Sequence, residues 1–226
     1  MSMSMISLED LRNIANDEGI PVLSVASVSS WDSDTIVSRI VPTDMRPGNI
    51  KDGCKVAIVL GLPIGYAMER IDGKRTYVEA YDIMNDMIDD AMERIAGEII
   101  DDGHNAVVIS RNRRDSKVIF SNRCAAYLAG IGTFGANNST ITERYGPRIR
   151  FGTILSDIDV ETSVPMDHQI CTGCMGCVRI CPQHLITYAR PLSIIDVEGC
   201  AEYSKRSTAS GKSPCERCID VCPIGK

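Results

Sequence analysis

The sequence predicts an α/β domain over residues 1–165, followed by a small cysteine-rich domain over residues 166–226. Two observations support the first domain. A continuous apolar run from Lys55 to Leu62 is typical of a strand buried on both faces. A long helical repeat of apolar residues then begins at Tyr77. The second domain is indicated by the cysteines, because eight of the ten lie beyond residue 170.

The elements near the N-terminus follow from local patterns. Ser7 precedes Leu8-Glu9-Asp10, which resembles a capping box and predicts a helix that ends near Gly19. The residues Ile20–Val28 are rich in β-formers and predict a strand. Residues 29–54 contain several prolines and glycines, so we expect mostly connecting segments there.

The clearest helix comes next, because apolar side chains recur at helical spacing and acidic residues occupy the other side. The apolar positions are Tyr77, Tyr81, Met84, Met87, Ile88, Ala91, Met92, Ile95 and Ile99. At about 1.5 Å per residue this helix would run roughly 35 Å, which is enough to cover a sheet. We favour core packing for the apolar stripe over the alternative of a cofactor wall. Gly103 can close the helix, and Ala106–Ser110 predicts the next strand.

The eight C-terminal cysteines form two related runs. The first is Cys171, Cys174, Cys177 and Cys181 followed by Pro182, and the second is Cys215, Cys218 and Cys222 followed by Pro223, with Cys200 upstream. The first spacing, C-x2-C-x2-C-x3-C-P, is that of bacterial ferredoxins. There, three thiolates of the run hold one iron–sulfur cube and the fourth reaches the other cube.

If each cluster takes its fourth ligand from the other run, each of these eight cysteines is used once. A closely spaced loop can place only three sulfurs on one cube, so the fourth must come from elsewhere. Cluster 1 is then expected to use Cys171, Cys174, Cys177 and Cys222. Cluster 2 is expected to use Cys200, Cys215, Cys218 and Cys181. We therefore predict a bacterial-ferredoxin-like module with two [4Fe–4S] clusters over residues 166–226, and hence a redox protein.

Zinc and disulfides are the alternative uses of these cysteines. Zinc sites also use paired C-x2-C units, but their usual pattern lacks a three-cysteine run ending in x3-C-P. Disulfides would need an oxidising compartment. Residues 1–10 show neither the basic segment nor the apolar core of a signal peptide, so we expect a cytoplasmic protein. The longest apolar stretch, Val56–Met68, contains glycine and proline and is too short to span a bilayer.

The charge balance argues against general nucleic-acid binding. The chain carries 24 Lys and Arg against 30 Asp and Glu, whereas nucleic-acid binding rests on neutralising phosphates. One local exception follows the predicted strand at residues 106–110 and consists of Arg111, Arg113, Arg114 and Lys117. This cluster could hold a phosphate group, but a solvated loop is the interpretation that we favour.

Residues 121–160 resemble the stretch before the ferredoxin module in epoxyqueuosine reductases and corrinoid reductive dehalogenases. Those families share an A-G-L-G-x-x-G turn, a Y/F-G-P-R element and a strand closing in T-D-x-x-L. The counterparts here are Ala129–Gly135 (AGIGTFG), Tyr145–Arg148 (YGPR) and Ile154–Asp157 (ILSD). The second cysteine run, with the isolated Cys200 upstream, resembles the epoxyqueuosine reductase version in particular.

The resemblance implies a nitroreductase-like α/β domain of the corrinoid-binding type, with the ferredoxin-like module beside it feeding electrons to cobalt. Gly130, Gly132 and Gly135 then become the candidate cofactor-binding residues, because glycine permits close backbone approach to a macrocycle. The alternative is that these glycines only form a tight turn between a helix and a strand.

The sequence departs from the family pattern at two places. Epoxyqueuosine reductases carry an acidic proton donor in a D-S-A-P element, and that position falls on Ser116 here. Asp115, one residue earlier, is the remaining candidate for a catalytic acid, and the catalytic residues are otherwise unassigned. The sequence ends at Lys226, directly after the second cluster motif, so we expect a short form without the C-terminal helical-repeat extension.

Two functions compete. The first is a cytoplasmic iron–sulfur oxidoreductase resembling epoxyqueuosine reductase. It would pass electrons through the two clusters to a cofactor, with a corrinoid such as cobalamin as the candidate, or to a substrate in the α/β domain. The second is an electron-transfer or reductive activator protein for a partner, such as a corrinoid protein, with no substrate chemistry of its own. Both need an electron donor, expected to be a reduced ferredoxin or flavodoxin, and neither needs a membrane or nucleic acid.

Overall fold

The computed structural model describes residues 6–70, 77–109, 120–190, 192–207 and 215–226. The chain divides into two compact units. Unit 1 contains residues 1–62, 85–131 and 150–165, and unit 2 contains residues 63–84, 132–149 and 166–226. Unit 2 thus combines the cysteine-rich segment with two segments from the first part of the chain. The organisation into one domain over 1–165 and another over 166–226 stays a prediction.

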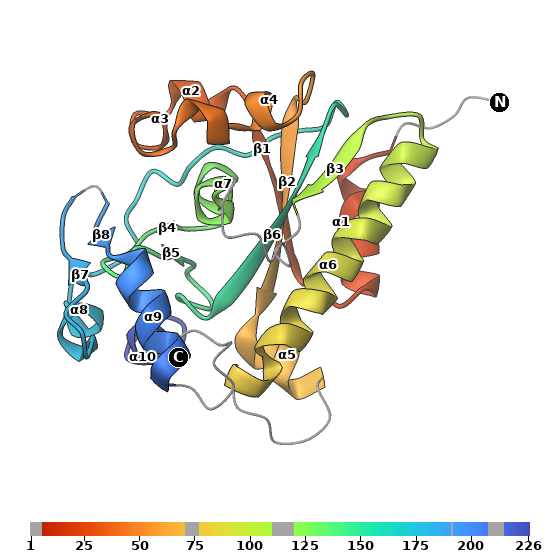
Figure 1. Ribbon diagram of the computed structural model, residues 1–226. Helices are drawn as coiled ribbons and strands as arrows, with labels where there is room; N and C mark the ends of the chain where they lie inside the picture. Colours follow the sequence, from red (N-terminus) through yellow and green to blue (C-terminus); the bar gives the residue numbers. More distant parts are fainter. Residues whose placement is uncertain (1–5, 71–76, 110–119, 191, 208–214) are drawn as a thin grey trace. The chain divides into compact units, whose positions relative to one another are not determined.

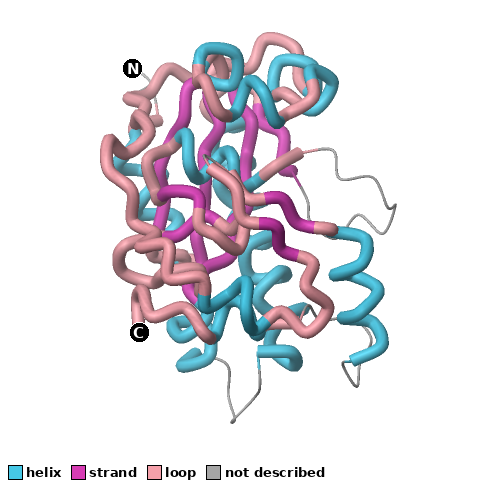
Figure 2. The backbone as a smooth tube through the Cα atoms, turned by 90° about the vertical axis from the view of Figure 1, so that its left-hand side faces the viewer, coloured by secondary structure: helices cyan, strands magenta, loops and turns pink. Residues whose placement is uncertain are grey.

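Unit 1 is built on a four-stranded sheet with the order β1-β2-β6-β3. The strands are β1 (Val22–Ser27), β2 (Val56–Pro63), β6 (Ile149–Ser156) and β3 (Ala106–Ile109), seen side by side in Figure 2. The pairs β1–β2 and β3–β6 are antiparallel.

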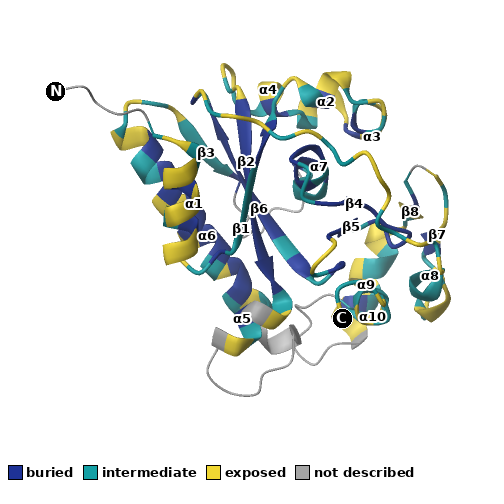
Figure 3. Ribbon diagram, turned by 180° about the vertical axis from the view of Figure 1, so that it is seen from behind, coloured by how far each residue is buried: buried dark blue, intermediate teal, exposed yellow. Residues whose placement is uncertain are grey.

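The two central strands, β2 and β6, are almost wholly buried, as the dark blue ribbon in Figure 3 shows. Each residue of β2 is buried, so the strand predicted over Lys55–Leu62 is confirmed. In β6 only Arg150 is partly exposed, and its Nε donates a hydrogen bond to Asn85 Oδ1 at 3.0 Å. The continuous apolar run of β2 therefore reflects cover on both faces of the sheet.

Helices cover both faces of this sheet. Helix α1 (Leu8–Asp17) and helix α6 (Tyr77–Asp101) lie on one face, and α7 (Asn122–Leu128) lies on the other (Figure 1). The predicted capping box is confirmed, because the Asp10 N–H donates to Ser7 Oγ and the Ser7 N–H donates to the Asp10 carboxylate. This reciprocal pair satisfies two backbone donors at the start of α1.

Helix α6 packs its apolar stripe inward, which confirms core packing as its role for the side chains that the structure describes. Ile88, Met92 and other members of the stripe are fully buried. A Cβ atom added at Gly152 of β6 would lie only 2.5 Å from Ile88, so helix and strand are in close contact. One acidic residue departs from the predicted polar side, since Asp89 is buried.

Residues 29–54, predicted as mostly connection, contain four short helical turns. They are α2 (Ser30–Ser33), α3 (Val37–Ile40), the 3-10 turn η1 (Thr43–Met45) and α4 (Pro47–Ile50). Trp31 anchors this region, with its buried ring 5.9 Å from the ring of Phe120. Arg46 holds the turns together through a 2.5 Å ion pair with Asp32 and a 2.7 Å hydrogen bond to the carbonyl of Ser38.

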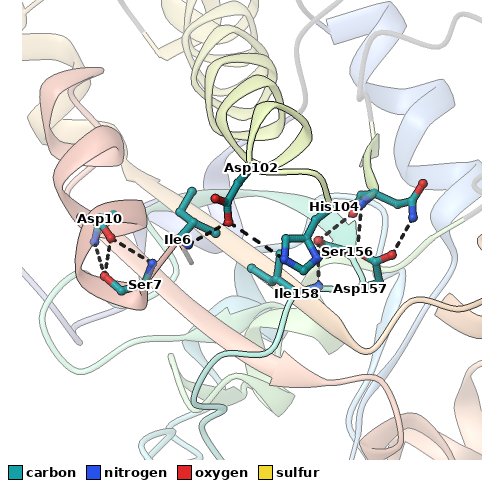
Figure 4. A network of polar contacts seen from close by, with 9 residues as sticks. Ile6, Ser7, Asp10, Asp102, His104, Ser156, Asp157 and Ile158 are labelled. Carbon is teal, nitrogen blue, oxygen red and sulfur yellow. Dashed lines mark hydrogen bonds and ion pairs between the residues drawn. The ribbon is translucent and has the colours of Figure 1, made fainter. Parts of the chain in front are cut away.

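A polar network joins three segments of unit 1, which are residues 6–10, 102–105 and 156–158 (Figure 4). Asp102 accepts the Ile6 N–H at 2.9 Å, and His104 Nδ1 lies 3.4 Å from Asp157 Oδ1. Asp157 also accepts the backbone N–H of Asn105 at 2.8 Å and its side-chain Nδ2 at 2.6 Å. These hydrogen bonds from Asn105, with a smaller contribution from His104, lower the pKa of Asp157 below its ordinary value of 3.8.

Unit 2 consists of short elements. They are α5 (Ile64–Arg70), the pair β4 (Thr133–Phe134) and β5 (Thr140–Ile141), α8 (Gly176–Ile180), the pair β7 (Ile186–Thr187) and β8 (Ile194–Ile195), α9 (Val197–Ser207) and α10 (Arg217–Asp220). Helices α8 and α10 contact each other and carry parts of the two cysteine runs. Among the helices of the described ranges, none combines the length and apolar character that crossing a bilayer requires.

Candidate metal centre

Four cysteines line the first of two hollows in unit 2. The wall consists of Cys171, Cys174, Cys177 and Cys222 together with Ala136, Asn137, Ile141, Thr172, Met175, Pro223 and Ile224. The hollow measures about 340 Å³, part of it open to solvent. The four cysteines are the set expected for cluster 1 and come from both runs.

The other four cysteines line a second hollow of about 380 Å³, again partly open. Its wall consists of Cys181, Cys200, Cys215 and Cys218 together with Pro182, Gln183, Leu185, Ile186, Ile195, Tyr203 and Arg217. These cysteines are the set expected for cluster 2, with Cys181 contributed by the first run. The structure therefore brings together, in two separate groups, the same residues that the spacing groups by crossing-over.

The loop of the first run is shaped by left-handed backbone conformations. Gly173 has φ +71° and Met175 has φ +59°, the latter uncommon for a residue with a side chain. Arg179 Nη2 donates to the carbonyl of Cys174 at 3.0 Å, which ties α8 back onto the loop. Beyond α8, the backbone N–H of Leu185 donates to Cys181 Sγ at 3.4 Å. Hydrogen bonds to ligand sulfurs are one of the features that set cluster potentials.

Helix α9 brings two cysteines of the second hollow together. Cys200 lies within the helix, and Ser204, one turn later and buried, accepts the Cys215 N–H at 2.8 Å. Cys200 is isolated in the sequence, but a direct hydrogen bond connects its helix, α9, to the start of the second run.

The YGPR element binds the end of the second run through hydrogen bonds and close packing. Arg148 Nη1 donates to the carbonyl oxygens of Ile219 at 3.1 Å and Cys222 at 3.0 Å, and its Nη2 donates to the carbonyl of Ile224. At Gly146, which has φ +56°, an added Cβ would lie closer than 3.0 Å to the carbonyl oxygen of Ile224. The sequence identified this element only as a family marker, because no local pattern indicates which distant backbone it contacts.

The thiols of each hollow are close enough to affect one another. Burial, followed by the neighbouring cysteines Cys200 and Cys215, raises the pKa of Cys218 to about 12. Burial first, then Cys215 and Cys181, also raises the pKa of Cys200. Such thiols do not ionise together without a compensating positive charge. Iron supplies that charge, since a coordinating thiol is deprotonated outright, so this donor set fits a metal cluster.

The arrangement differs from a site for one ion. Among the described residues, no three or more His, Cys, Asp or Glu side chains converge on a point that could hold a single metal ion. In each hollow the four cysteines instead surround an open volume. A [4Fe–4S] cluster is bound by four thiolates on separate irons, so the hollows match what a cluster needs.

The candidate cofactor-binding glycines are accounted for by internal packing. A Cβ added at Gly130, which has φ +66°, would lie 2.5 Å from the carbonyl oxygen of Val164. At Gly132 the added atom would clash with the backbone of Ile141, and at Gly135 with the Ile141 side chain. The chain's own atoms thus occupy the space beside each Cα, as a tight turn requires. Cofactor binding by these glycines stays a prediction.

The other candidate residues lie outside the described ranges. They are the possible acid Asp115 with its neighbour Ser116, and the basic cluster of Arg111, Arg113, Arg114 and Lys117. The catalytic-acid and anion-site hypotheses therefore stay predictions.

Comparison with known proteins finds two groups of relatives and no matching family model. Tetrachloroethene reductive dehalogenase from Desulfitobacterium hafniense is 26% identical over 118 residues, covering 45% of this chain and 21% of the relative. Epoxyqueuosine reductase from Bacillus cereus is 27% identical over 114 residues, covering 47% of this chain and 30% of the relative. The match thus spans less than a third of either protein.

Solved structures of both groups share the fold over 96% of this chain. An epoxyqueuosine reductase in complex with a tRNA stem loop superposes with a TM-score of 0.64 at 17% identity, covering 64% of that chain. A reductive dehalogenase studied for B12-dependent dehalogenation superposes with a TM-score of 0.65 at 20% identity, covering 32% of that chain.

The chain therefore has the mixed α/β fold of a group of redox enzymes. Within that group, the resemblance to epoxyqueuosine reductases and reductive dehalogenases that residues 121–160 indicated is confirmed by sequence relatives and structural neighbours of both kinds.

Proposed function

We propose that this chain is an iron–sulfur oxidoreductase that passes electrons through two [4Fe–4S] clusters to an acceptor in its α/β part. One observation carries the proposal: eight cysteines line two hollows, four to each, in crossed sets. Each set provides the four thiolates of one cube. The similarity to two groups of redox enzymes supports the same class of chemistry. Thiolate ligation also favours a reducing compartment, so we place the protein in the cytoplasm.

The clusters would supply one-electron transfer, and the surrounding residues would set how readily it occurs. Arg148 would hold Cys222 in place for cluster 1. The Leu185 N–H would stabilise negative charge on Cys181, a ligand of cluster 2. Apolar side chains such as Leu185, Ile186 and Ile195 would limit water around cluster 2. Such groups beyond the ligands tune potential through charge, hydrogen bonding and solvent access.

The two hollows differ in the parts of the chain that line them. The first hollow includes Ala136, Asn137 and Ile141, which follow the glycine turn directly in sequence. The second is lined only by residues between Cys181 and Cys218, as far as the described residues show. Cluster 1 is therefore the cluster in contact with the segment that the resemblance associates with the acceptor.

The described residues fit a corrinoid less well than they fit the clusters. The space beside Gly130, Gly132 and Gly135 is filled by the chain itself, and both hollows are lined by cysteines. We therefore propose no chemical step that uses a corrinoid. The filled space beside these glycines favours the second candidate function, an electron-transfer or activator protein whose acceptor is a partner.

Metal analysis of anaerobically purified protein tests the proposal. We expect about eight iron and eight acid-labile sulfide per chain, because each cubane holds four of each, with brown absorbance that dithionite bleaches. Stoichiometric zinc without iron would contradict the proposal.

A second spectrum, recorded after adding cobalamin, separates the two candidate functions. Tight binding, followed by dithionite reduction of cobalt that depends on the clusters, would support an acceptor within this chain. Intact clusters with no bound cobalamin and no small-molecule turnover would support the electron-transfer protein.

A further inference from the structure

One ligand of the first hollow lies at the surface. Of the ten cysteines, all of which are in the described ranges, Cys174 alone is exposed. A cluster bound there would meet solvent through this ligand, whereas the other seven ligands are only partly accessible. Because electron transfer between proteins needs close approach to the redox centre, the loop around Cys174 is where an external donor can come nearest.

Two guanidinium groups flank this loop. Arg179 donates to the carbonyl of Cys174 at 3.0 Å. Arg190 donates to the hydroxyl of Tyr188 at 2.8 Å, and a Cβ added at Gly173 would lie 4.0 Å from Arg190 Nη2 and 3.9 Å from that hydroxyl. Both arginines are exposed, as is Tyr188. We call Cys174, Arg179, Tyr188 and Arg190 the docking face.

The acidic residue close to the start of the first run, Asp167, is paired with a histidine. Asp167 and Glu143 bind the two nitrogens of His168 at 3.2 Å and 2.9 Å. Hydrogen bonding to Asp167 and then to Glu143 raises the pKa of His168, so the imidazole carries positive charge over a wider pH range. This pairing offsets part of the negative charge of Asp167, which precedes the first run in the sequence.

The part of the sequence that carries the docking face differs in charge from the chain as a whole. The net charge is −6, while residues 166–226 hold seven basic and six acidic residues, a balance of +1. An acidic protein would be repelled by most of this chain and attracted to the two arginines. Local charges of this kind orient a partner and raise its association rate, with little effect on the chemistry that follows.

We propose that the docking face binds an acidic one-electron carrier protein, which reduces cluster 1 through the Cys174 edge. This inference rests on the proposed function. In the transfer the carrier's cofactor loses one electron and the oxidised cluster gains it, so no proton or further reactant is needed. Two arginines around one exposed ligand suit a weak, transient complex with a small interface.

The test compares two reductants of different size and charge by stopped flow at low salt. The first is reduced flavodoxin, an acidic carrier protein, and the second is photoreduced 5-deazariboflavin, a small uncharged molecule. In the cluster-loaded double variant Arg179→Gln/Arg190→Gln, we expect cluster reduction by flavodoxin to slow roughly tenfold or more and to lose its salt dependence. Reduction by deazariboflavin should keep the wild-type rate.

Two further variants keep the outcome interpretable. Arg206→Gln on α9 removes the same charge from a residue paired with Glu202 at 3.6 Å, away from the first run in sequence, and should leave both rates unchanged. Arg190→Gln alone leaves the hydrogen bond from Arg179 to Cys174 in place and should show a smaller loss in the same direction.

A wild-type rate with flavodoxin in the double variant would overturn the inference. Equal slowing with both reductants would also overturn it, because the arginines would then act on the cluster and not on docking. If deazariboflavin fails to reduce any cluster in the wild-type protein, the proposed function itself fails, which is a different result.

Discussion

Arg148 Nη1 donates a hydrogen bond to the carbonyl oxygen of Cys222 at 3.0 Å, across 74 positions of sequence. The same side chain binds the carbonyls of Ile219 and Ile224 on either side. A single guanidinium thus holds the backbone before and after the crossing ligand of the proposed cluster 1, and it places a positive charge beside that ligand.

Replacing Arg148 should therefore affect cluster 1 more than cluster 2. In Arg148→Gln we expect a lower reduction potential for cluster 1, because a nearby positive charge favours the more negative reduced state. Arg148→Lys should recover the charge but not the three hydrogen bonds, since lysine lacks the planar fork of donors. Redox titration followed by EPR reports each cluster separately.

The matched control is Arg144→Gln, which removes an exposed guanidinium that lies 5.3 Å from the centroid of the Tyr145 ring. It should leave both potentials unchanged. Equal potentials for cluster 1 in Arg148→Gln and the wild type would show that Arg148 has no electrostatic role.

Gly146→Ala should loosen the end of the second run, because the added methyl group is too close to its backbone. An added Cβ would meet the backbone carbonyl of Ile224, and the residue would be held at φ +56°. We expect cluster 1 to be lost faster in air, followed as the decay of visible absorbance. Gly48→Ala is the control, because an added Cβ there would meet nothing within 4 Å. Equal decay in both variants would contradict this account of the loop.

Gly97→Ala should stabilise unit 1. Gly97 lies inside helix α6, and an added Cβ would meet nothing within 4 Å. Alanine restricts the unfolded chain and favours helix, so we expect the free energy of unfolding to rise by roughly 0.5–1 kcal/mol. Denaturant unfolding followed by circular dichroism measures the change. A decrease would mean that the surroundings of this helix are more crowded than the structure indicates.

Asp157→Asn should lower stability in a pH-dependent way. The carboxylate of Asp157 has a lowered pKa, chiefly through the hydrogen bonds from Asn105. Because the folded-state pKa is below the unfolded one, the charge contributes stability above the ordinary value of 3.8, and this is lost as the pH falls through the folded-state pKa.

Thermal unfolding of wild type and variant between pH 3 and pH 7 checks this prediction. The difference in melting temperature should be present at pH 7 and shrink at the acid end. Asp159→Asn, an exposed aspartate two residues further on, is the control and should show little difference. A constant difference at all pH values would contradict a role for the charge.

Much of the fold could be predicted where the determining interactions are local or repeat along the chain. The apolar run at Lys55–Leu62 indicated β2, and the Ser7–Asp10 pattern indicated the start of α1. The grouping of the cysteines around the two hollows also follows from local chemistry, because a closely spaced loop can place only three sulfurs on one cube and the fourth must come from elsewhere. The four turns between residues 30 and 50 escaped prediction, since helices of three or four residues have too little periodicity.

The role of Arg148 could not be predicted for a different reason. Its partners are backbone carbonyls more than 70 residues away, and backbone atoms leave no signature in the sequence. The burial of Asp89 likewise depends on what packs against α6, and not on the helical pattern itself. Sequence patterns thus located the ligands, while the residues that hold them in place became visible only in the structure.

The most direct test of the central claim is the effect of Cys181→Ser and Cys222→Ser on the two clusters. Each variant should lose most of one cluster, or about four of eight irons, and the cluster lost should be the one held mainly by the other run. Thus Cys222→Ser should remove the EPR signal of the cluster held by Cys171, Cys174 and Cys177, and Cys181→Ser that of the other. Loss of the cluster belonging to the variant's own run would contradict the crossed assignment.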